Sequence, residues 1–229
     1  MNELFDKLII RIIFTCFICA IIYFYKIAHS KLHPHTKSQL NTKFYPSKNA
    51  ASTIHLFSRI IGIGIIFSEF YFYLSDNILI TLLDFFIQAS SCLFLFLLST
   101  YVLESIVLFN FDYNDEIQKR KNISYAIICF ALSVAVAQLI KSILIISNNS
   151  LVLLFFLWLF AIVLIGFATK SYRFISKMPL NRLVIQKNYP MSFSYTGFIW
   201  GWSLIISTAL HHPLNNIKWY SIQVILKIL

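Results

Sequence analysis

The fold is decided by an uncharged apolar run, LVLLFFLWLFAIVLIGF, at residues 151–167. A bilayer core about 30 Å thick is crossed by about 20 helical residues, so such a run is typical of a membrane-spanning helix. Over the whole chain, 59% of residues are hydrophobic, 12% are charged, and the mean hydropathy is +0.75. Soluble proteins contain about 25% charged residues. The composition therefore excludes an ordinary soluble domain and predicts an all-α polytopic transmembrane bundle.

Similar runs along the chain predict about seven spans. The expected spans are residues 7–28, 50–73, 77–107, 123–147, 151–175, 190–210 and 215–229. The last is short, and an interfacial helix is the alternative for it. The first lacks a small-residue cleavage site before His29, so we expect it to remain in the mature protein rather than serve as a signal peptide.

Basic residues concentrate in the longer loops after the first, third and fifth expected spans, whereas the other linkers are short and carry only Asp76. Cytoplasmic loops of membrane proteins carry an excess of Lys and Arg. This pattern predicts cytoplasmic basic loops and an outside N-terminus. The same topology explains the net charge of +10, so no nucleic-acid partner is expected.

Each basic loop ends in the same dipeptide, at Lys48-Asn49, Lys121-Asn122 and Lys187-Asn188. The spacing predicts three helical-hairpin repeats, at residues 1–73, 74–147 and 148–214, followed by a C-terminal span at 215–229. An Asn at the start of a helix can accept a hydrogen bond from a free backbone N–H of the first turn. We therefore expect the three Asn side chains to cap the helices that follow them, which is a structural role rather than a ligand-binding one.

Small residues recur nine and thirteen positions after each Asn. They are Ser58, Gly62, Ala131, Ala135, Gly197 and Gly201. Positions four apart share one helix face, and small residues on such a face let two helix backbones approach closely in lipid. The pattern predicts that the second, fourth and sixth spans pack together as inner helices, while the odd-numbered spans face lipid.

The loop-to-helix pattern resembles a known family. The residues that carry the resemblance are Leu32-His33-Pro34-His35, Gln39-Leu40, Lys48-Asn49-Ala50-Ala51-Ser52 and Gly62 in the first copy, Asp115-Glu116-Ile117, Lys121-Asn122 and Ala126 in the second, and Lys187-Asn188, Gly197 and Gly201 in the third. Over roughly residues 8–210 the chain resembles the bacterial inner-membrane family called domain of unknown function 350, of the YjfL type. The second and third copies lack the Ala-Ala pair. The resemblance implies a hairpin-based membrane protein of unestablished activity, in an envelope-stress or polyamine-related setting.

Ionisable residues inside a membrane are costly and often functional. The candidate intramembrane polar site consists of Arg59, Glu69, Asp84, Gln88 and Lys141. Glu69 and Lys141 are expected to pair near the outer ends of their spans. Asp84 lies four residues before Gln88 on the same helix face, with Lys141 or Arg59 as its expected partner. A static ion pair between hairpins and a transport path are both compatible with this set, and the static pair is favoured because a single copy of the repeat carries the Asp.

His55 and Glu104 are expected near the cytoplasmic ends of their spans, within reach of the headgroups. The four Cys residues lie in apolar segments and are expected to pack as small apolar side chains, so no disulfide, metal or cofactor is predicted. Phosphate-loop, dinucleotide-binding, zinc-protease and serine-hydrolase motifs do not occur in the sequence. The sequence thus favours a non-enzymatic membrane component whose partners are the lipid bilayer and itself or other membrane proteins. The alternative is a small transporter or channel with a path between spans two, four and six.

Overall fold

The computed structural model describes residues 2–32, 49–70, 78–109, 111–147, 150–212 and 217–228, and all regular structure in these ranges is helical. The elements are α1 (Asn2–Leu32), α3 (Ala50–Phe67), α4 (Ile78–Val107), the π-helix η2 (Asn114–Lys119), α5 (Ile123–Ser147), α6 (Leu151–Ser176), α7 (Leu180–Ile185), α8 (Tyr189–Leu210) and α9 (Ile217–Ile228). Most of the first basic loop, including Lys37, Lys43 and Lys48, lies outside the described residues, as does the linker with Asp76.

The chain divides into two compact units, residues 1–49 and residues 50–229. In the described part of the first unit, α1 is the regular element, and the second unit contains α3 to α9. The boundaries of the three expected hairpins, which divide the chain differently, remain a prediction.

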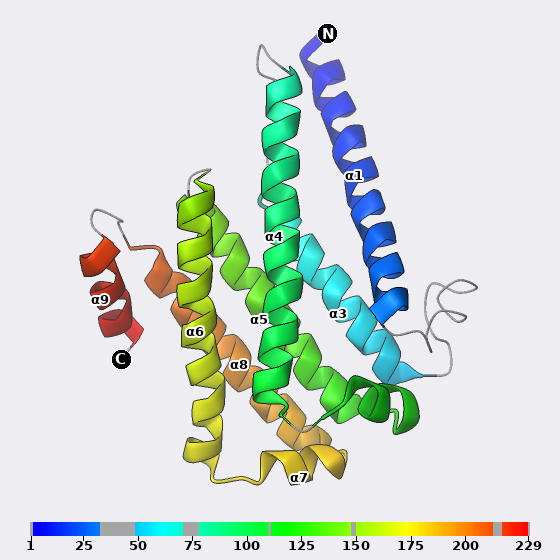
Figure 1. The fold of residues 1–229 in the computed structure, drawn as a ribbon, viewed down its shortest axis with the longest axis vertical. Helices are drawn as coiled ribbons and strands as arrows, with labels where there is room; N and C mark the ends of the chain where they lie inside the picture. The colour runs from blue at the N-terminus through cyan, green and yellow to red at the C-terminus, as the bar shows by residue number, and fades with distance from the viewer. Residues whose placement is uncertain are drawn as a thin grey trace. The chain divides into compact units, whose positions relative to one another are not determined.

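Helix α5 forms the core of the second unit. α3 and α8 each pack along α5 instead of packing extensively against each other, and α4 and α6 also contact it (Figure 1). In the most apolar 18-residue stretch of each helix, the share of buried residues is 72% for α5 and 56% for α3. It is 39% for α4 and 28% for α6. The second and fourth expected spans are therefore more buried than the third and fifth, as the small-residue pattern predicts.

The small residues of α3 and α5 lie inside the helix contacts. Ser58, Ala131 and Ala135 are fully buried. At Gly62 an added Cβ would overlap the ring of Phe96 on α4, so only glycine permits this approach. Four of the six expected packing positions are therefore buried where helices meet.

The expectation for Gly197 and Gly201 is wrong. Gly197 is exposed, Gly201 is half-buried, and a Cβ added at either would meet no atom within 4 Å. The buried face of α8 instead carries Tyr195, Ile199 and Ser203. The strict Gly-x-x-x-Gly motif is therefore not used in the described packing of its own chain, because α8 turns a different stripe toward α5.

Among the described residues, five helices are long and apolar enough to cross a membrane, and the protein is accordingly membrane-embedded. The segments are Arg11–Lys31, Ala50–Phe67, Leu83–Val107, Ile123–Ser147 and Leu151–Ser176. The sixth and seventh expected spans correspond to α8, with 22 residues, and α9, with 12 residues. Because α8 and α9 are not among the five qualifying segments, the count of seven remains a prediction.

The loops that lead into α5 and α8 share one backbone feature, a residue with positive φ directly before the capping Asn. In both loops the Lys of the Lys-Asn dipeptide adopts positive φ, at 49° for Lys121 and 56° for Lys187. A short helix precedes each loop, η2 before α5 and α7 before α8. Left-handed backbone is unfavourable for a residue with a Cβ. The second and third Lys-Asn dipeptides thus turn the chain in the same strained way.

Replacing Lys121 by Gly is expected to stabilise the protein by about 0.5–1 kcal/mol, because glycine adopts positive φ without the Cβ strain. Thermal unfolding of the purified protein in detergent measures the effect. Gln186→Gly is the control, since Gln186 is exposed with φ −76° and should gain nothing. A Lys121→Gly protein that melts below the wild type would contradict the strain.

Candidate functional site

An ion pair joins α3 to α4 within the second unit. Arg59 Nη2 lies 2.6 Å from Glu104 Oε1, and the side chains are 6% and 16% exposed. Arg59 Nη1 also donates to Ser133 Oγ on α5. One guanidinium therefore connects three helices, and its charge is neutralised by a carboxylate that is itself largely removed from solvent.

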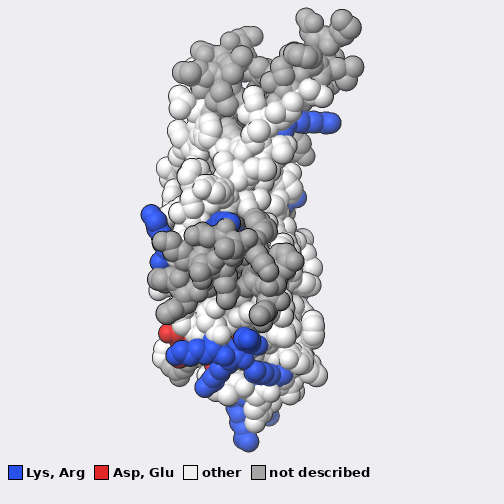
Figure 2. Space-filling model, turned by 90° about the vertical axis from the view of Figure 1, so that its right-hand side faces the viewer, with Lys and Arg blue, Asp and Glu red and all other residues white. Residues whose placement is uncertain are grey.

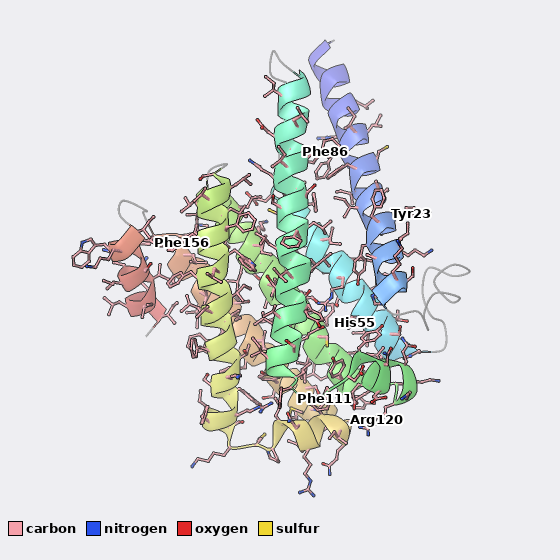
Figure 3. The ribbon with its side chains drawn as sticks, viewed as in Figure 1. Tyr23, His55, Phe86, Phe111, Arg120 and Phe156 are labelled. Atoms are coloured by element: carbon pink, nitrogen blue, oxygen red, sulfur yellow. The ribbon has the colours of Figure 1, made fainter. Side chains whose placement is uncertain are left out.

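His55 lies one turn before Arg59 on the same face of α3. Its Nε2 lies 3.8 Å from Glu104 Oε1, and its ring meets that of Tyr113 edge-on with centroids 4.8 Å apart. The i, i+4 spacing of His55 and Arg59 directs both side chains toward the carboxylate. Figure 3 shows His55 at the part of α3 that lies near η2.

Cys129 completes the cluster from α5, one turn before Ser133. Its thiol is fully buried, and its Sγ, a ring nitrogen of His55 and a carboxylate oxygen of Glu104 all lie within 4.8 Å of one another. Ser133 donates to the Cys129 carbonyl at 3.0 Å and lies 3.2 Å from Ser58 Oγ. We call His55, Arg59, Glu104, Cys129 and Ser133 the three-helix cluster.

The cluster lies near one end of the helices that form it. At 1.5 Å per residue, His55 is about 8 Å into α3, Glu104 about 5 Å from the end of α4, and Cys129 about 9 Å into α5. This is the end where η2 and α7 lie, and Figure 2 shows Lys and Arg side chains gathered there. Those elements and the loops beside them contribute Lys119, Arg120, Lys121, Lys177, Arg182 and Lys187.

The π-helix η2 forms a polar layer beside the cluster. Burial raises the pKa of Tyr113 to about 12, so its phenol stays neutral and cannot add an anion to the cluster. On the surface, a hydrogen bond from Lys119 lowers the pKa of the Asp115 carboxyl, and the same contact raises the pKa of Lys119. Glu116 is buried and accepts from Arg120 Nη1 at 2.9 Å.

Asn122 caps α5 and also links η2 to α7. Its Oδ1 accepts from Tyr125 N at 3.3 Å, while its Nδ2 donates to Glu116 Oε2 at 2.7 Å and to Val184 O at 2.9 Å. Asn188 caps α8 through its Oδ1, which accepts from Met191 N at 3.0 Å. The capping role is confirmed at both positions. Asn49 is buried and directly precedes α3 in the sequence.

The pair expected between Glu69 and Lys141 is present. Lys141 Nζ lies 3.2 Å from Glu69 Oε2 and 3.1 Å from Ser68 Oγ. The Lys141 side chain is 36% exposed and the Glu69 side chain is 24% exposed. This pair is therefore much more accessible than the pair of Arg59 and Glu104. It joins the far end of α3 to α5.

The expectation for Asp84 is wrong. Asp84 is exposed on α4, and its two expected partners form ion pairs with other carboxylates, Lys141 with Glu69 and Arg59 with Glu104. Gln88 is half-buried one turn further along α4. The structure therefore separates the predicted polar site into an outer pair, an exposed Asp84 and an Arg59 that belongs to a different cluster.

The sequence pattern does not predict that His55 and Glu104 meet Arg59, and it predicts apolar packing for Cys129. Depth along the helix does not identify Glu104, because a side chain near a helix end can still face the interior. The available signal was the His55-x-x-x-Arg59 spacing, which places two polar side chains on one helix face, where the buried charge of Arg59 requires an anion.

Comparison with protein families gives a match to the family described as Domain of Unknown Function (DUF350), over residues 3–144. The chain belongs to the DUF350 family. The DUF350 match includes every residue of the three-helix cluster and ends before α6, so it is shorter than the expected resemblance over residues 8–210. Comparison of this DUF350 protein with curated proteins and with solved structures gives no match.

Proposed function

We propose that this DUF350 protein is a non-enzymatic, multi-pass component of the bacterial inner membrane that acts by assembling with itself or with other membrane proteins. In the proposal it has about seven spans in three hairpins, an outside N-terminus and cytoplasmic basic loops. Its setting in the envelope-stress response is the part that rests on the family resemblance alone. The observation that carries assembly is the Gly197-x-x-x-Gly201 motif on α8, in which Gly197 is exposed, Gly201 is half-buried, and a Cβ added at either would meet no described atom within 4 Å.

The exposed motif has the shape that a second helix requires. Gly197 and Gly201 lie one turn apart, and the large exposed side chains of Phe193 and Leu204 flank them along the same face. Lipid chains give helices no hydrophobic reason to associate, so close backbone approach over small residues is a main source of helix pairing in membranes. A glycine pair that its own chain leaves open supports docking of a helix from a second molecule.

The test measures self-association of the full chain in lipid nanodiscs or vesicles. Energy transfer between labelled copies of the chain reports the association. Replacing both Gly197 and Gly201 by Leu is expected to weaken association about tenfold or more, because the side chains hold the backbones apart. Thermal stability should change little, since a Cβ at either position would meet no atom within 4 Å in the part of the chain that the structure describes.

Gly64→Leu is the matched control. Gly64 is also exposed, and its Cβ would meet nothing within 4 Å, but it lies on α3 and has no glycine partner four residues away. Association should survive this change. A wild-type protein that stays monomeric at every lipid ratio, or a Gly64→Leu protein that loses association equally, would overturn the proposal.

The alternative remains a transporter or channel with a path between spans two, four and six. Buried intramembrane charge at Arg59 and Glu104 favours it. However, α3 and α8 pack along α5 rather than around a shared space, so a path lined by all three helices would require a second copy of the chain. If the protein mediates a flux of solute into vesicles, and the double substitution Gly197→Leu with Gly201→Leu abolishes this flux, the result would support a transport path formed by two copies of the chain.

A further inference from the structure

Three side chains of the three-helix cluster are potential metal ligands. His55, Glu104 and Cys129 come from α3, α4 and α5, and their donor atoms lie within 4.8 Å of one another. His55 and Cys129 are buried, and Glu104 is half-buried. We propose that these three residues bind a divalent transition-metal ion of the zinc class, a role that goes beyond assembly.

The donor types select the metal. Imidazole nitrogen and thiolate sulfur suit Zn²⁺ and related ions, whereas Mg²⁺ and Ca²⁺ prefer all-oxygen ligand sets. Donor atoms of a tetrahedral zinc site lie about 3.3–3.7 Å apart, given metal–ligand bonds of about 2.0–2.3 Å. The cluster, at 4.8 Å or less, closes to that geometry through side-chain shifts of about an ångström.

Arg59 belongs to the same cluster through its contact with Glu104. Binding of M²⁺ displaces the thiol proton of Cys129 to solvent, so the ion meets one thiolate and one carboxylate, and the site including Arg59 carries one net positive charge. Glu104 has two carboxylate oxygens. Oε1 lies 2.6 Å from Arg59 Nη2 and can keep this contact, while Oε2 ligates the metal. Arg59 and Ser133 then orient the ligand carboxylate from behind, as outer-shell partners do in other metal sites.

The position of the cluster supports entry of an ion. It lies within about 10 Å of the end where α3 and α5 begin, so the ion does not have to reach the centre of the bilayer. Tyr113, which follows α4, covers His55 through an edge-on ring contact. Three protein ligands on three helices also mean that a bound ion joins α3, α4 and α5 at one point.

The experiment uses the full chain, purified in detergent without metal and titrated with Co²⁺ and Zn²⁺. One Co²⁺ per chain is expected, with a thiolate-to-cobalt charge-transfer absorption that Zn²⁺ removes by displacement. Cys129→Ser should abolish this absorption. Cys92→Ser is the matched control, because Cys92 is a buried Cys on α4 outside the donor group and its loss should leave the absorption intact.

Substitution of the other ligands gives an independent arm. His55→Ala and Glu104→Gln are expected to lower affinity for Zn²⁺ about tenfold or more, measured by equilibrium dialysis with elemental analysis. Cys129→His replaces one zinc ligand by another and should retain stoichiometric Zn²⁺ without the thiolate absorption. Absence of stoichiometric Co²⁺ in the wild type, or an absorption that survives Cys129→Ser, overturns the site and leaves the cluster an ion pair alone.

Discussion

Glu104→Gln is expected to destabilise the protein by about 3–5 kcal/mol, because it leaves the Arg59 guanidinium buried without a counter-charge. Arg59 is 5% exposed as a residue and also bonds Ser133, so it cannot turn to solvent without losing its position between α3 and α5. The loss should appear as a large fall in the melting temperature of the purified protein in detergent, measured without added metal.

A paired substitution separates charge from packing. Arg59→Met with Glu104→Leu removes both charges and keeps apolar volume, and it should recover most of the lost stability, since replacing a buried pair by apolar residues is often neutral or stabilising. Glu69→Gln is the control at the more accessible Lys141 pair and should change stability by about 0–1 kcal/mol. Equal losses for Glu104→Gln and Glu69→Gln would contradict the importance of burial.

Asn122→Ala is expected to destabilise the protein by about 2–4 kcal/mol. The change removes a helix cap, which contributes about 1 kcal/mol. It also removes the hydrogen bonds to the buried Glu116 carboxylate and to the Val184 carbonyl, at about 0.5–1.5 kcal/mol each. Chemical or thermal unfolding of the purified protein in detergent gives the value.

Asn188→Ala provides the comparison within the same chain. Asn188 accepts the same kind of capping bond, but among the described residues its side chain does not bond to a second loop, so its loss should be about 1 kcal/mol. Because the two Asn residues occupy corresponding places in the Lys-Asn dipeptides, the difference between them measures the link from Asn122 to η2 and α7. Equal losses at both positions would show that the link contributes nothing.

The helices, the buried character of α5 and the Asn caps were predictable because they depend on local sequence. Apolar runs set helix length, and an Asn before an apolar run caps the helix it precedes. The Glu69–Lys141 pair was also predictable, since both residues lie at similar depth on helices that the small-residue pattern makes neighbours. To predict these features, it is enough to know how far a residue lies along its helix and which helix lies beside it.

Rotation about the helix axis explains the failures. Gly197 and Gly201 have the spacing of a packing face, but α8 contacts α5 through Tyr195, Ile199 and Ser203 instead. Asp84 lies at a suitable depth but on an exposed face of α4, and Glu104, near the helix end, faces inward. An apolar helix has no polar side to mark which face is outward, so pattern alone cannot fix its rotation.

The long separation between Arg59 and its partners also constrains biosynthesis. Glu104 follows Arg59 by 45 residues and Ser133 by 74. At about 5–20 residues per second, the ribosome delivers Glu104 about 2–9 s after Arg59. During that interval the nascent α3 carries an uncompensated positive charge, which its position near the helix end allows to reach the headgroups. The packing of α3 is therefore completed only after both α4 and α5 have been translated, so the order of synthesis sets the order in which this part of the protein assembles.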